Sequence, residues 1–78
     1  MEMKDLVTLM VKALVDFPEE VKVTEISSDN TTIIELSVAP GDIGKVIGKK
    51  GKTAKAIRNI LSASSAKYNK KTMFEIKE

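Results

Sequence analysis

Over residues 3–17, apolar and polar positions alternate with the period of an α-helix, about 3.6 residues. The polar face carries Lys4, Asp5, Thr8, Lys12 and Asp16, and the apolar face carries Met3, Leu6, Val7, Met10, Ala13, Leu14 and Phe17. Pro18 ends the predicted helix, because a proline in a helix interior loses a hydrogen bond and clashes with the preceding turn. Since Leu9 and Val15 widen the apolar stripe, we expect this helix to cover a small sheet.

Two stretches after Pro18 alternate as β-strands do. Residues 21–27 alternate imperfectly, because Val21 and Val23 share one side and Ile26 breaks the period. Residues 32–38 alternate regularly, and a run of Ser, Asp, Asn and Thr before them favours a turn. The inward positions of this second strand are Ile34, Leu36 and Val38. The pattern predicts an antiparallel hairpin with one face under helices and the other in solvent.

A short helix is predicted over residues 43–46, after Pro40 and Gly41 break the second strand. Asp42 is a suitable N-cap for it. Gly44 lies inside this helix and weakens it by about 1 kcal/mol relative to alanine. Its absent side chain either lets a ligand approach or lets the helix pack closely on a neighbour.

A long helix is predicted over residues 52–67, followed by Asn69, which suits a left-handed exit from a helix. Its core face is Ala54, Ile57, Leu61, Ser64 and Tyr68, and beside it runs a seam of Ala56, Ile60 and Ala63. Residues 72–77 then form a last strand with Phe74 and Ile76 inward. The order is α-β-β-α-α-β, so the fold class is α+β, with three strands and three helices in one domain over residues 1–78.

Between the two later helices lies the loop Gly48-Lys49-Lys50-Gly51. Glycine adopts positive φ and lets another chain come close. A helix start also presents unpaired N–H groups and partial positive charge. With the two lysines between the glycines, the loop is predicted to bind a chain of phosphates.

The net charge of +2 conceals an uneven distribution of charge. Residues 1–40 carry three lysines against eight acids, whereas residues 41–78 carry ten basic residues against three acids. From Lys45 to Arg58 there are six positive charges and no acid. Basic clusters often only solubilise a helix face, but one built around a glycine loop is typical of a polyanion-binding protein.

Val46-Ile47-Gly48-Lys49-Lys50-Gly51, with Ile57 in the following helix, resembles the signature of the KH domain, whose GXXG loop clamps a few nucleotides of RNA or single-stranded DNA. The order of elements resembles the type II, bacterial form of that fold. A chain consisting of little else resembles the small bacterial KH proteins of the KhpA type. That resemblance implies single-stranded RNA as the ligand, self-association, and pairing with a larger KH-containing protein. It also implies an RNA chaperone or post-transcriptional regulator. The cytoplasm is the expected location, because the sequence has no long apolar run and Met1–Asp5 lacks the basic flank of a signal peptide.

The residues to which the resemblance and the basic cluster assign RNA binding are Ile43, Gly44, Lys45, Ile47, Gly48, Lys49, Lys50, Gly51, Lys52, Lys55 and Arg58. Family analogy places the bases on a small apolar floor. Ile43, Gly44 and Ile47 form one wall of it, and the second strand around Ile34 to Leu36 forms the other. A core position is the better prediction for Val46 and for at least one of Ile34 and Leu36.

Several other functions are disfavoured by composition. The chain has no His and no Cys, so it lacks the commonest general base and the commonest metal ligands, and we expect no enzyme activity, metal or cofactor. Gly51-Lys52-Thr53 ends like a nucleotide-binding P-loop, but Val46 occupies the position where that motif needs its first glycine. No apolar run approaches the roughly 20 residues that a membrane helix needs. Three aromatic residues are too few for a base-stacking sheet.

A protein-interaction module with little nucleic-acid affinity remains the main alternative, because KH-like folds also serve as docking domains. Single-stranded DNA remains an alternative ligand. Both glycines and both lysines of the loop are present, which favours RNA binding. The seam of Ala56, Ile60 and Ala63 is the predicted interface for self-association.

Overall fold

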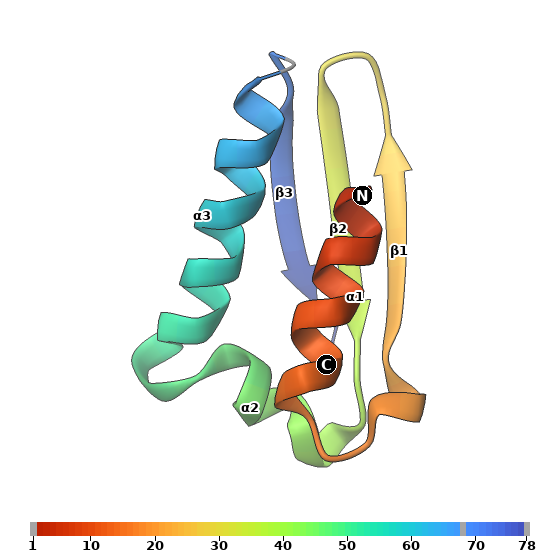
Figure 1. Cartoon of the computed structure of the whole chain (residues 1–78), viewed down its shortest axis with the longest axis vertical. Helices are drawn as coiled ribbons and strands as arrows, with labels where there is room; N and C mark the ends of the chain where they lie inside the picture. Colours follow the sequence, from red (N-terminus) through yellow and green to blue (C-terminus); the bar gives the residue numbers. More distant parts are fainter. Residues whose placement is uncertain (1, 68, 78) are drawn as a thin grey trace.

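A computed structural model describes residues 2–67 and 69–77. Three strands form one sheet, and three helices lie on one face of it (Figure 1). The helices are α1 (Met3–Leu14), α2 (Ile43–Ile47) and α3 (Lys52–Ala66), and the strands are β1 (Lys22–Ser27), β2 (Thr31–Ser37) and β3 (Lys71–Ile76). Single 3-10 turns occupy Pro18–Glu20, Pro40–Asp42 and Lys49–Gly51. The predicted α+β class and order of elements are confirmed.

The central strand is β2, which pairs antiparallel with β1 and parallel with β3. Ile34 lies at the middle of this arrangement, opposite Glu25 of β1 and Phe74 of β3. Parallel neighbours need a crossover connection, and here α2, the glycine loop and α3 provide it (Figure 1). The loop therefore lies at the corner where the crossover turns back along the sheet.

The core lies between the sheet and the helices. Its buried members are Val7, Val11, Val15, Ile34, Leu36, Val38, Val46, Ile57, Leu61 and Phe74. Ile34, Leu36 and Val46 are all fully buried. The sequence predicted core positions for Val46 and for at least one of Ile34 and Leu36, and this prediction is confirmed. Val23 and Ile76 are half-buried, and Ile26 is exposed, which explains the broken alternation of β1.

Helix α1 is shorter than predicted and faces the core differently. It ends at Leu14, where residue 17 was predicted, and Phe17 is 52% exposed. The helix buries Val7 and Val11, whereas Ala13 and Leu14 of the predicted apolar face are exposed. The apolar stripe was wide enough to allow either orientation, and packing on the sheet selects the Val7–Val11–Val15 side.

Helix α3 matches its predicted face with one shift. Ala54, Ile57 and Leu61 are buried as predicted, but the next buried position is Ser65, and Ser64 is half-buried. The Ser65 hydroxyl donates a hydrogen bond to the Ser62 carbonyl oxygen at 3.2 Å, so this buried hydroxyl has a hydrogen-bond partner. Tyr68, also predicted for this face, lies outside the described residues. Asn69 has φ 56°, which confirms the predicted left-handed exit.

Candidate nucleic-acid interface

The GXXG loop is a compact turn in which three of four residues have positive φ. These are Gly48 at 78°, Lys50 at 57° and Gly51 at 74°. The Gly48 N–H donates to the Gly44 carbonyl at 2.9 Å and closes α2, and the Gly51 N–H donates to the Gly48 carbonyl at 3.1 Å. A lysine in the left-handed region is strained by about 1 kcal/mol, and such strain is typical of ligand-binding loops.

The lysines of the loop point to solvent. Lys49 and Lys50 are exposed, and neither takes part in an ion pair with the described residues. Gly51 immediately precedes α3, so no capping side chain covers the N–H groups of its first turn. Lys52 also lies in that turn, where its charge adds to the positive end of the helix dipole. The loop and the start of α3 lie at a corner of the fold (Figure 1), and their exposed lysines make this corner positively charged.

Positive charge continues from this corner along α3. Lys52, Lys55 and Arg58 are all exposed, and their spacing of three places them along one side of the helix. The buried residues Ala54, Ile57 and Leu61 lie on the side that packs on the core. No acid of the described chain forms an ion pair with the three basic residues. Their charges are thus available to an external anion.

An apolar surface adjoins the loop on α2. Ile43 and Ile47 are half-buried and one helical turn apart, whereas Val46 is fully buried. Gly44 is exposed, and a Cβ added there would meet nothing within 4 Å. Close helix packing at Gly44 is therefore excluded as the reason for the glycine, and an open surface remains.

The opposite wall expected from β2 is not made by its apolar side chains. Ile34 and Leu36 point into the core and are fully buried, so they cannot contact a base. The sequence pattern of β2 predicted that inward orientation correctly, and the analogy that placed a binding wall there was wrong for these two side chains.

Lys45 differs from the other basic residues predicted to bind RNA because it forms ion pairs within the described chain. Its Nζ lies 3.1 Å from Asp16 Oδ2 and 3.8 Å from Asp42 Oδ1. The hydrogen bond to the Asp16 carboxylate and the charge of that group raise the pKa of Lys45 above its ordinary value, with a smaller contribution from Asp42. Lys45 is therefore a cation whose charge is already balanced by two carboxylates.

Asp42 does not cap α2 as predicted. Its side chain makes no cap hydrogen bond to α2 and is 1% exposed. Its two oxygens instead accept the backbone N–H groups of Asp16 at 3.1 Å and Phe17 at 3.0 Å. These N–H groups would otherwise extend α1, so the same contact explains why that helix ends early.

The comparison with known proteins decides the family. A sequence model of the KH domain of KhpA and KhpB matches residues 4–76. The chain belongs to this family. The RNA-binding protein KhpA of Clostridium acetobutylicum is 50% identical over 74 residues, covering 95% of this chain and 99% of the relative. The RNA-binding protein KhpA of Chlamydia trachomatis is 51% identical over 76 residues, 97% of each chain, and that of Aquifex aeolicus is 49% identical over 76 residues. No solved structure matches.

The seam that the sequence suggested for KH-domain self-association lies on the outside of α3. Ala56, Ile60 and Ala63 are all exposed, and Ile60 keeps 46% of its residue surface accessible. The three residues follow helical spacing and therefore form one narrow strip. The strip is separate from the buried positions Ile57 and Leu61.

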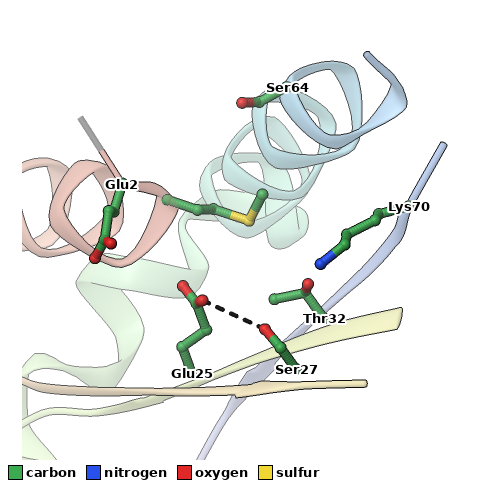
Figure 2. Close-up of a pocket in the computed structure, with 7 residues that line it drawn as sticks. Glu2, Glu25, Ser27, Thr32, Ser64 and Lys70 are labelled. Carbon is green, nitrogen blue, oxygen red and sulfur yellow. Dashed lines mark hydrogen bonds between the residues drawn. The ribbon is translucent and has the colours of Figure 1, made fainter. Parts of the chain in front are cut away.

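A pocket of about 370 Å³ lies at the other end of α3 from the GXXG loop. Figure 2 shows the side chains that line it. Met3 and Glu2 border it from the start of α1, Glu25, Ser27 and Thr32 from the hairpin, and Ser64 and Lys70 from the end of α3 and the chain after it. Its two carboxylates and one ammonium give it no net positive charge. The pocket is thus distinct from the basic corner.

Within residues 2–67 and 69–77, no group of three metal-ligating side chains comes together. No described helix of this KH domain is long and apolar enough to span a membrane.

Proposed function

We propose that this chain is an RNA-binding protein that acts as one KH domain over residues 1–78 and holds a short single-stranded stretch of RNA. The observation that carries the proposal is the Gly48–Gly51 turn at the start of a helix, whose two lysines are exposed and form no ion pair with the residues that the structure describes. The names of the relatives support RNA as the polymer. The protein would bind without catalysis, in the cytoplasm, as a chaperone or post-transcriptional regulator.

In this mechanism the backbone of the RNA follows the loop. Backbone N–H groups at the start of α3 face the phosphate oxygens, and Lys49 and Lys50 neutralise the negative charge of the phosphates. Lys52, Lys55 and Arg58 extend the positive track along α3. The bases lie over the open surface of α2, where Gly44 lets them approach. A site of about four nucleotides gives modest discrimination between sequences.

The salt dependence of binding tests this mechanism. If about three phosphates are neutralised, the logarithm of the RNA association constant should fall with the logarithm of salt concentration at a slope of roughly −2. Fluorescence anisotropy with a labelled single-stranded RNA measures the slope, and the same sequence as DNA shows whether the sugar matters. An affinity that does not change with salt would contradict phosphate clamping.

Self-association is the second part of the proposal. One short site binds weakly, and joining two sites raises the affinity through effective concentration. The exposed Ala56–Ile60–Ala63 strip is the proposed contact, either with a second copy or with a larger KH-containing partner.

Replacing Ile60 by aspartate tests the strip, because a charge at the centre of an apolar contact opposes its burial. We expect light scattering to report about half the mass of the unaltered protein if that protein is a dimer. Leu9→Asp is the matched control, since Leu9 is also an exposed apolar residue in the middle of a helix. An unchanged mass for Ile60→Asp would exclude the strip as the interface.

A further inference from the structure

Asp42 joins two parts of the chain that are distant in sequence. It lies immediately before α2, and both its oxygens accept N–H groups from the segment after α1, 25 and 26 residues away. The side chain is buried, so its charge needs partners. The two N–H groups and Lys45 supply them, at 3.0, 3.1 and 3.8 Å.

Lys45 completes the connection from α2 itself. Its Nζ reaches both Asp42 and the exposed carboxylate of Asp16, so one ammonium joins α2 to the end of α1. The three side chains together carry one net negative charge. This group therefore adds no positive charge to the track that runs from Lys49 and Lys50 along α3.

The direction of Lys45 on α2 also separates it from Ile43 and Ile47, the apolar part of the binding surface. Successive residues of an α-helix are turned by about 100°. Lys45 is two residues from both Ile43 and Ile47, so its side chain leaves the helix about 160° away from theirs. The face of α2 that carries Ile43 and Ile47 is thus opposite the face that holds the ion pair.

Helix α2 needs such an anchor. It has five residues, and a helix this short is not stable without tertiary contacts. Its first end is held by Asp42, and its last end continues directly into Gly48 of the loop. A tilt of α2 would therefore displace both the Gly44 surface and the loop.

We propose that Asp42 and Lys45 are positioning residues of the RNA site: they fix α2 to the end of α1 and thereby orient the loop, without contacting RNA. This inference rests on the proposed RNA-binding function and adds residues that act on the site from behind. Lys45, which the sequence analysis included among the RNA-binding residues, has here an indirect role.

The decisive measurement is RNA affinity together with its salt slope, at a temperature where each variant is folded by circular dichroism. Asp42→Asn keeps the shape but sets its amide group against one of the two N–H donors. We expect roughly tenfold weaker binding, which is about the effect of one charge-assisted hydrogen bond, with an unchanged slope. Lys45→Ala should also weaken binding without changing the slope, and Lys45→Arg should restore it.

A phosphate contact would behave differently, because its loss makes the slope shallower by about 0.7. A shallower slope for Lys45→Ala would therefore overturn the positioning role. Folded Asp42→Asn with unaltered affinity would also overturn it, since the contact would then serve stability alone. Amide chemical shifts of Gly44 and Gly48 give an independent readout, and we expect both to move in Asp42→Asn.

Two controls keep the outcomes separate. Glu25→Gln makes the same kind of carboxylate-to-amide change at a residue of β1 that accepts a hydrogen bond from the Ser27 hydroxyl at 3.4 Å, away from α2, and should leave RNA affinity unchanged. Asp16→Asn replaces Asp42→Asn if the latter does not fold, because Asp16 is 67% exposed, and it should weaken binding with an unchanged slope.

If Lys49→Asp with Lys50→Asp binds RNA normally, the proposed function itself fails. If that double variant loses RNA affinity while Asp42→Asn and Lys45→Ala keep it, the function stands and the positioning role fails.

Discussion

Replacing Lys49 and Lys50 together by aspartate should weaken single-stranded RNA binding by about 100-fold or more at moderate salt. The change removes two exposed cations from the loop and sets two anions in their place, where the proposed mechanism puts the phosphates. The fold should remain intact, because both side chains are in solvent and neither is ion-paired with the described residues. Aspartate also tolerates the left-handed φ of 57° at Lys50 better than lysine does.

The matched control reverses the same amount of charge elsewhere. Lys70 and Lys71 are exposed at the start of β3, where Lys71 pairs with Thr31 at the end of the sheet opposite α2. Lys70→Asp with Lys71→Asp should weaken binding only slightly, through the altered net charge. Anisotropy titrations of both variants, with melting temperatures by circular dichroism, separate local from general electrostatics. Equal losses in the two variants would argue against a specific site at the loop.

The parts of the fold that the sequence predicted correctly are governed by local patterns. The alternation in β2, the heptad-like spacing of Ala54, Ile57 and Leu61, and the glycine pair each span a few residues. Turn chemistry at Asn69 is equally local, and its left-handed conformation was foreseen. Because neighbouring residues determine such features, the sequence alone identified the order of elements and the loop.

The errors arise where distant residues meet. Asp42 looked like a local helix cap, but its partners are the N–H groups of residues 16 and 17, and no pattern near Asp42 reveals them. The same contact moved the end of α1 and exposed Phe17. The pairing of Lys45 with Asp16 was missed for the same reason. One signal was present: Asp16 is an acid near the end of α1, where the helix dipole does not favour it.

Gly48→Ala should be the most destabilising single change in the loop, by about 3 kcal/mol in the free energy of unfolding. Gly48 has φ 78° and ψ 173°, a conformation that residues with a Cβ rarely adopt. An added Cβ would overlap the Thr53 hydroxyl and lie 2.7 Å from Thr53 Cβ and 2.8 Å from its backbone nitrogen. Because Thr53 is in the first turn of α3, relief requires α2 and α3 to move apart, and RNA affinity should fall as well.

Gly51→Ala is the matched comparison, because it tests positive φ without the clash. Gly51 has φ 74° and ψ 12°, and a Cβ there would meet nothing within 4 Å. Only the strain of the left-handed conformation remains, so the free energy of unfolding should fall by about 1 kcal/mol. Urea unfolding of both variants measures the difference. The double variant Gly48→Ala with Thr53→Ala lacks the Thr53 hydroxyl. It should regain only part of the stability lost in Gly48→Ala, because the backbone nitrogen of residue 53 stays in place. Equal losses for the two glycines would show that the contact with Thr53 does not determine the conformation of the loop.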